Sequence, residues 1–74
     1  MTGSLPFNED AEISLLGALL IDNEKIPEVR QTLPDPGGFY KIPHQRAYKA
    51  ILALHDRGEP VDQVTVPETM VSQN

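Results

Sequence analysis

The chain has 74 residues, no cysteine, a hydrophobic fraction of 39% and a formal net charge of −5. A chain this short makes one small domain that buries only about 60% of its unfolded surface, and without cysteine neither a disulfide nor a thiolate zinc site can stabilise it. The hydrophobic content argues against a disordered chain, and the acidic balance disfavours a nucleic-acid-binding surface. Oligomerisation, or attachment to a larger protein, is the support that remains.

The amino end divides into an arm, residues 1–7, and the start of a helical domain that covers residues 8–74. Pro6 biases Leu5 away from helix, and Asn8 is a typical helix N-cap. Three carboxylates that follow the cap favour the positive end of a helix, namely Glu9, Asp10 and Glu12. The amino end has no basic segment before its apolar run, so we predict no secretory signal.

Ile13–Ile21 is the most apolar stretch of the chain, with only Ser14 and Gly17 interrupting it. In a helix these side chains point all round the axis, which predicts a central helix covered on most sides. The stretch spans only about 14 Å as a helix, too short to cross a bilayer. Gly17 weakens a helix interior, which suggests that another backbone passes close by. We expect this helix to run from Asn8 to about Ile21.

Two further helices follow. Pro27 suits the first turn of a helix, which predicts a short helix over Pro27–Leu33, and the Pro- and Gly-rich run 34–38 predicts a loop. The third helix is expected to run from Pro43 to Gly58, with Gly58 as its C-terminal glycine. Its predicted inner face carries His44, Ala47, Tyr48, Ile51, Leu52, Leu54 and His55. The opposite face carries Gln45, Arg46, Lys49, Asp56 and Arg57.

A fourth helix is predicted to begin near Val66. Thr65 and Glu68 have the spacing of a capping box, in which Thr65 caps the helix and Glu68 reaches back. The sequence stops at Asn74, so we expect the last helix to be truncated. Residues 61–66 are the best candidate for a strand, but no run alternates with period two for long enough to favour one. The expected fold class is therefore all-α, a small globular bundle of about four helices.

The expected core comprises Ile13, Leu16, Leu20, Phe39, Tyr48, Ile51 and Leu52. Four apolar residues on the less regular helices are candidates for a protein interface, namely Ile26, Val29, Val66 and Met70. Such a self-complementary patch would cover leftover apolar surface in a two-fold dimer. The alternative, that all four are ordinary core residues, is equally open at this stage.

The sequence contains no residue pattern that clearly favours a catalytic, cofactor or metal site. Gly37 and Gly38 are not followed by the Lys-Ser/Thr of a phosphate loop, and they fit a plain turn. His44 and His55 share one side of the third helix, but about 16 Å of helix separates them, too far to share one metal ion. The carboxylates are explained by helix starts and turns. We therefore predict no catalytic, cofactor or metal site.

One alternative concerns DNA. If the third helix were a recognition helix, Arg46, Lys49 and Arg57 would face a duplex together. However, charges opposite an apolar face are usually only solvated, and Asp56 lies among them. Direct binding of nucleic acid is therefore disfavoured.

Several stretches, taken in order, resemble a known family. They are Pro6-x-Asn8 before Ala11-Glu12, the run Leu16–Leu20, Asp22-Asn23, Phe39-Tyr40, Pro43-His44-Gln45 and Gly58–Asp62 leading into Val64-Thr65-Val66. From about Leu5 to its end, the chain resembles the amino-terminal domain of the DnaB-type replicative DNA helicases.

The resemblance implies an all-helical domain that helps to build the collar of a hexameric helicase and to recruit primase and a helicase loader. It implies self-association, as a dimer or within a hexamer, and a cytoplasmic location in a bacterial or phage replisome. It also implies that ATP and Mg²⁺ act only in a separate motor domain, so these residues are expected to be non-catalytic. The alternatives are a free-standing helical adaptor for replication proteins and the DNA-binding module described above.

Overall fold

The computed structural model describes residues 8–73, so the predicted arm, residues 1–7, and Asn74 lie outside the described residues. Four α-helices and two short 3₁₀ turns follow one another along the chain. They are α1 (Glu9–Ile21), η1 (Asn23–Lys25), α2 (Ile26–Thr32), η2 (Pro36–Gly38), α3 (Ile42–Asp56) and α4 (Thr65–Gln73). Residues 8–73 contain no strand: within the strand candidate over residues 61–66, residues 61–64 form a loop and residues 65–66 begin α4. The expected all-α class is confirmed.

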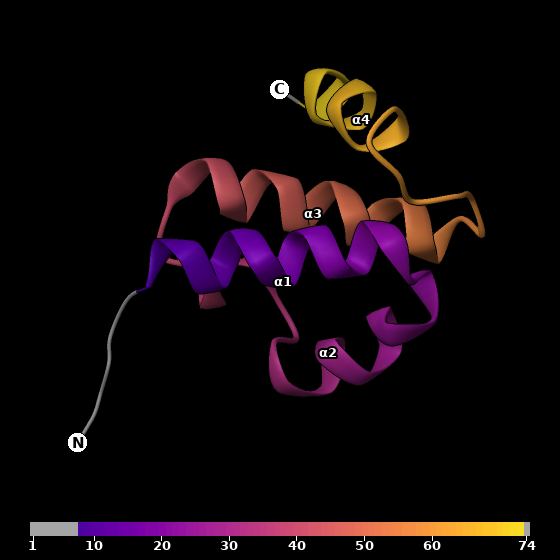
Figure 1. Cartoon of the computed structure of the whole chain (residues 1–74). Helices are drawn as coiled ribbons and strands as arrows, with labels where there is room; N and C mark the ends of the chain where they lie inside the picture. The colour runs from indigo at the N-terminus through magenta and orange to yellow at the C-terminus, as the bar shows by residue number, and fades with distance from the viewer. Residues whose placement is uncertain (1–7, 74) are drawn as a thin grey trace.

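The two longest helices, α1 and α3, lie side by side and run in the same direction (Figure 1). Glu12, near the start of α1, bonds to the backbone just before α3, and Asn23, after the end of α1, bonds to the backbone of Val61 beyond α3. The chain returns from the end of α1 to the start of α3 through α2 and η2. Helix α4 packs on α3.

Contacts from α3 hold this return segment in place. Arg30 of α2 and Asp56 of α3 form a paired ion bridge, with Nη1–Oδ1 and Nη2–Oδ2 distances of 2.6 and 3.1 Å. The buried Tyr48 donates its hydroxyl to the Leu33 carbonyl at 2.6 Å, and its ring lies 5.0 Å from the ring of Phe39. The C-terminal half of α2 is therefore fixed to α3, although α2 has only seven residues.

The core lies around α3. Among residues 8–73, eleven hydrophobic residues are buried: Leu16, Leu19, Ile26, Phe39, Tyr48, Ala50, Ile51, Leu52, Leu54, Val61 and Val66. Of the expected core, Leu20 is partly buried and packs against this cluster. Ile13 was expected in the core, but it is 51% exposed. Leu19 and Val61, which were not expected in the core, are among the most buried side chains, and Leu54 of the predicted inner face is buried as well.

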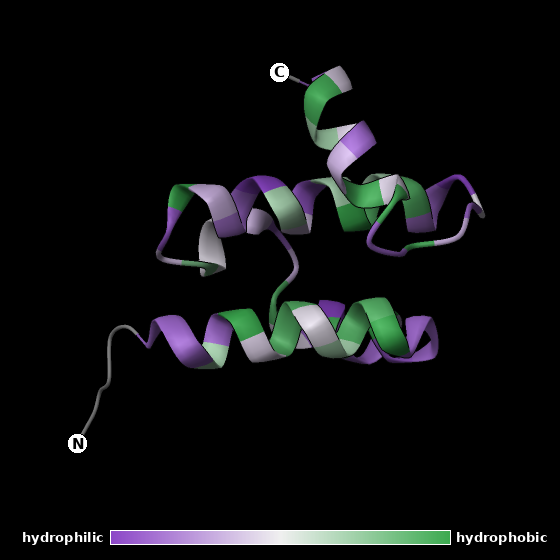
Figure 2. Cartoon of the chain, turned by 45° about the horizontal axis from the view of Figure 1, so that its top comes forward, coloured by the Kyte–Doolittle hydropathy of each residue, from purple (hydrophilic) through white to green (hydrophobic). Residues whose placement is uncertain are grey.

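Helix α1 departs most from expectation. Hydrophobic residues continue along it from its middle to its end (Figure 2), yet only one side of the helix is buried, through Leu16 and Leu19. Ile21 is 89% exposed. A Cβ added at Gly17 would meet nothing within 4 Å, so no backbone passes close by and that expectation is wrong. The cause is size, because a small domain has only enough chain to cover one side of this helix.

The helix ends follow local chemistry. The Asn8 side chain accepts a hydrogen bond from the Ala11 amide at 3.0 Å, which confirms the N-cap. At the end of α3, Gly58 adopts φ +71°, and the Glu59 amide donates to the Leu54 carbonyl at 3.0 Å. This arrangement is a Schellman motif, in which a residue without Cβ is strongly favoured.

The cap of α4 differs from the prediction. Asp62, not Thr65, caps the helix: its Oδ1 accepts from the amides of Val64 and Thr65 at 2.8 and 2.9 Å. Thr65 takes the reciprocal place, because its Oγ1 accepts from the Asp62 amide at 2.9 Å. The capping pair thus begins three residues earlier than the Thr65–Glu68 pair that the sequence suggested. These backbone hydrogen bonds lower the pKa of Asp62, the one from Thr65 most.

Candidate functional site

The four predicted interface residues do not form a surface patch. Ile26 is fully buried and Val66 is 5% exposed, so neither is available to a partner. Val29 and Met70 are partly buried and pack against the core. Ile26 and Val66 instead belong to the buried hydrophobic cluster.

The exposed apolar surface lies instead on the outer face of α1, which we define as Ile13, Gly17 and Ile21. These residues are four apart, so they lie along one side of the helix. Ile13 and Ile21 are among the exposed large hydrophobic residues, and the space over Gly17 is open. The other members of that group are Tyr40, Ile42, Val64 and Val71. An apolar strip with an open centre is typical of a surface that packs against another protein.

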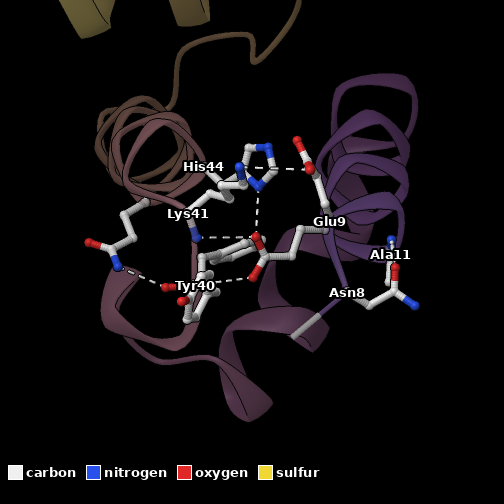
Figure 3. A network of polar contacts seen from close by, with 9 residues as sticks. Asn8, Glu9, Ala11, Tyr40, Lys41 and His44 are labelled. Atoms are coloured by element: carbon white, nitrogen blue, oxygen red, sulfur yellow. Dashed lines mark hydrogen bonds and ion pairs between the residues drawn. The ribbon is translucent and has the colours of Figure 1, made fainter. Parts of the chain in front are cut away.

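Glu12, near the start of α1, bonds to the segment that leads into α3. Figure 3 shows Tyr40, Lys41 and His44 of that segment beside the start of α1. Its Oε2 accepts from the Tyr40 amide at 2.6 Å, and its Oε1 lies 2.6 Å from Nδ1 of His44 and 3.5 Å from the Lys41 amide. The side chains of Glu12 and His44 are only 14% and 15% exposed. Sequence reasoning assigned Glu12 to the helix start alone and therefore missed this contact, which spans about 30 residues of chain.

Two opposing effects act on the Glu12 carboxyl. Desolvation by burial raises its pKa, but hydrogen bonds from His44 and from the amides of Tyr40 and Lys41 together outweigh it, so the pKa lies below its ordinary value. Next to this contact, Lys41 Nζ lies 3.7 Å from Glu9 Oε1, as Figure 3 shows. The site is thus an ionised carboxylate that positions one helix on another, and it resembles a structural clamp more than a catalytic group.

Asn23 makes a second clamp at the opposite end of α1. Its Nδ2 donates to the carbonyls of Leu19 and Val61, both at 2.8 Å, and its Oδ1 accepts from the Val61 amide at 3.0 Å. An amide side chain is suited to this position because it both donates and accepts. The loop after α3 is therefore fixed to the turn after α1.

Neither histidine has the surroundings of a metal ligand. His44 bonds to Glu12, and His55 lies in the last turn of α3. Among residues 8–73, no group of three or more His, Cys, Asp or Glu side chains could hold a metal ion. No helix in this part of the chain is long and apolar enough to span a bilayer.

The predicted basic face of α3 is divided. Arg57 lies 3.3 Å from a carboxylate oxygen of Glu59, which compensates part of its charge. Arg46 and Lys49 have no ion-pair partner within the described residues, and they line a depression of about 210 Å³ with Met70 and Gln73. Two free cations in a chain of net charge −5 make a small basic spot, not a basic face.

Comparison with known proteins decides the family. Residues 4–74 match the family model described as the DnaB-like helicase N terminal domain. The chain belongs to this family. The crystal structure of the N-terminal domain of DnaB helicase from Mycobacterium tuberculosis superimposes with a TM-score of 0.85 at 41% identity, over 95% of this chain and 48% of that one.

Curated relatives of this DnaB-like domain are replicative helicases. The replicative DNA helicase DnaC of Bacillus subtilis is 40% identical over 67 residues, which is 90% of this chain and 14% of the relative. The replicative DNA helicase DnaB of Mycobacterium leprae is 48% identical over 56 residues, 76% of this chain and 9% of the relative. The chain therefore corresponds to the N-terminal domain of a replicative helicase and contains none of the motor domain.

The structure also explains why two separate stretches carried the resemblance. The Asp22-Asn23 pair and the Gly58–Asp62 run lie far apart in sequence, but the Asn23 clamp brings them together at Val61. Gly58 supplies the positive φ that ends α3, and Asp62 caps α4. In this DnaB-like domain, the Gly58–Asp62 run forms most of the loop that connects α3 to α4, and Asn23 bonds to it.

Proposed function

We propose that this DnaB-like domain is an assembly and interaction module of a replicative helicase. It supports the collar of a hexamer and the recruitment of primase and a helicase loader in a bacterial or phage replisome, without a catalytic site of its own. ATP hydrolysis on Mg²⁺ belongs to a motor domain of the same helicase. The observation that carries this proposal is the outer face of α1, an apolar strip that the domain leaves uncovered.

The proposal follows from the cost of leaving that strip in water. Ile13 and Ile21 are 51% and 89% exposed, and covering an isoleucine side chain contributes about 1.5–3 kcal/mol. A second copy of the same helix, packed antiparallel across a two-fold axis, would place Gly17 against Gly17 and let the helices approach closely. Two clamps, at Glu12 and Asn23, hold α1 rigidly for such packing.

Recruitment is tested with purified primase and loader from the same replisome, each titrated against this domain and followed by biolayer interferometry. We expect at least one of them to bind, and we expect binding to weaken when Ile13 and Ile21 are both replaced by serine, if the outer face of α1 is shared between collar and partner. Absence of binding by both proteins to the folded domain would contradict the recruitment part of the proposal.

Direct contact with DNA is the second candidate, favoured by one observation: Arg46 and Lys49 are free of ion pairs within residues 8–73. Each phosphate that a cation neutralises makes affinity fall with salt, so duplex binding through two cations would show a slope of about −2 in a plot of log affinity against log salt. Loss of binding in Arg46→Gln and Lys49→Gln would support this function. A domain that does not bind duplex DNA at low salt would contradict it.

A further inference from the structure

An open groove of about 700 Å³ lies between the turn after α1 and the loop after α3. We call it the proline groove, because Pro27 and Pro60 both line it, together with His55 and Gly58. Glu24 and Glu59 are its carboxylates, and within the described residues no Lys or Arg lines it. The groove is therefore lined by proline and histidine rings and by two carboxylates that carry negative charge.

The walls of the groove are already fixed in the free domain. The Asn23 clamp joins its two sides, since Asn23 bonds to the backbone of Val61 next to Pro60. The Schellman motif fixes Gly58 and Glu59 against the end of α3, and both prolines have restricted backbones. A ligand that enters such a preformed groove loses little free energy to ordering the protein.

The chemistry of the lining defines the occupant. Proline and histidine rings can pack against the methylene stem of a long side chain, while carboxylates at the rim bind its charged end. Arginine suits this arrangement better than lysine, because its planar guanidinium stacks on rings and pairs with a carboxylate through two hydrogen bonds. The domain itself provides an example, as Arg57 pairs with Glu59 through Nε and Nη2 at 3.3 and 3.4 Å.

We infer that the proline groove binds an arginine-bearing extended peptide segment of a partner protein, with the guanidinium between Glu24 and Glu59. The Arg57–Glu59 pair does not block this, because its side chains are about half exposed and its bonds are longer than a strong charge-assisted bond of about 2.8 Å. The inference rests on the proposed role as an interaction module.

The test is a titration of the domain with a labelled peptide of alternating arginine and proline, followed by fluorescence anisotropy at low salt. A peptide with glutamate in place of arginine and one with lysine serve as comparison probes. Glu24→Gln and Glu59→Gln each remove one charge from the groove. Glu68→Gln removes one charge from the exposed surface of α4, outside the groove, and is the matched control.

We expect the arginine peptide to bind more tightly than the lysine peptide and the glutamate peptide not to bind. Each groove variant should weaken binding roughly two- to fivefold, the effect of one exposed ion pair, while Glu68→Gln should leave it unchanged. In an amide NMR spectrum, the shifted signals should include Glu24, Gly58 and Glu59. Equal weakening by all three variants would mean general attraction to an acidic protein, and it would overturn the inference, as would no binding.

Sedimentation of the same samples without peptide tests self-association separately from peptide binding in the groove. A domain that self-associates but does not bind the peptide retains the proposed function and refutes the groove. A domain that binds the peptide but remains a monomer at every concentration refutes self-association and leaves the groove standing.

Discussion

At the residue scale, Glu12 shows what a sequence can and cannot predict. Its place in the first turn of α1 is explained by the helix dipole, and sequence reasoning went no further. In the structure its carboxylate also binds the Tyr40 amide and His44, on a segment almost 30 residues away. A contact of this kind leaves no local periodicity or spacing in the sequence, so it became visible only when α1 and α3 were placed side by side.

Glu12→Gln should destabilise the domain at neutral pH by about 1–3 kcal/mol, because hydrogen bonds to an ionised acceptor are replaced by weaker ones to a neutral amide. The folded pKa of Glu12 lies below its ordinary value of 4.5, so the unfolded chain binds more protons as the pH falls. The stability from Glu12 is therefore present above pH 4.5 and lost as the pH falls through the folded pKa.

Urea unfolding at several pH values measures this effect. The difference between wild type and Glu12→Gln should be largest near neutrality and should shrink in acid. Glu28→Gln, on the exposed side of α2, is the control and should follow the wild type. A constant difference at all pH values would show that the charge of Glu12 does not stabilise the contact.

Asn23 carries the second prediction at this scale. Asn23→Ala removes all three hydrogen bonds of the clamp, and Asn23→Asp keeps only the acceptor for the Val61 amide. We expect each variant to lose about 1–3 kcal/mol. Hydrogen exchange should separate them, because the Val61 amide keeps a partner in the aspartate variant and loses it in the alanine variant. Wild-type stability in both variants would mean that the clamp contributes nothing.

At the element scale, the helices with one clear apolar face were predicted best. The third helix, the Pro- and Gly-rich loop and the role of Gly58 followed from local rules, and α3 is confirmed to within about one residue at its start. Helix α1 was predicted as an element but not in its burial, because side chains that are apolar all round do not indicate which side is covered. The cap of α4 was misplaced because Asp62 and Thr65 form a capping pair at the same spacing as Thr65 and Glu68.

Replacing each of two glycines by alanine should change the stability of the domain in opposite directions. Gly58→Ala places a Cβ at φ +71° and should cost about 1–2 kcal/mol. Gly17→Ala meets nothing within 4 Å inside a helix and should gain about 0.5–1 kcal/mol. Thermal unfolding of both variants, at a concentration low enough to keep the protein monomeric, measures the two changes in stability. A loss of stability in Gly17→Ala would mean that α1 is covered in the monomer after all.

The buried and exposed sides of α1 can be tested by introducing aspartate at one position on each side. Leu16→Asp puts an unpaired carboxylate into the core, at a cost of several kcal/mol that a domain this small does not tolerate, so it should unfold. Ile13→Asp makes the same change on the exposed side and should stay folded. Far-UV circular dichroism and a cooperative melt distinguish the outcomes. A folded Leu16→Asp variant would contradict the core described above.

At the scale of the whole molecule, a fully buried core lies next to an exposed apolar face on α1. The core around α3 is complete, since its largest side chains are fully buried, whereas the outer face of α1 is left in water. Length and composition predicted that such a chain would need outside support. They could not say where, and the four residues chosen from sequence include two that the structure buries. The family resemblance predicted the fold correctly, because it depends on the order of many short stretches.

The most direct test of the central claim is sedimentation equilibrium of the domain over a wide range of concentrations. We expect the wild-type domain to self-associate reversibly in the micromolar range or more weakly. The variant with Ile13 and Ile21 both replaced by serine should be a strict monomer. A wild-type protein that remains monomeric at every concentration would contradict the central claim, as would a serine variant that associates as strongly as the wild type.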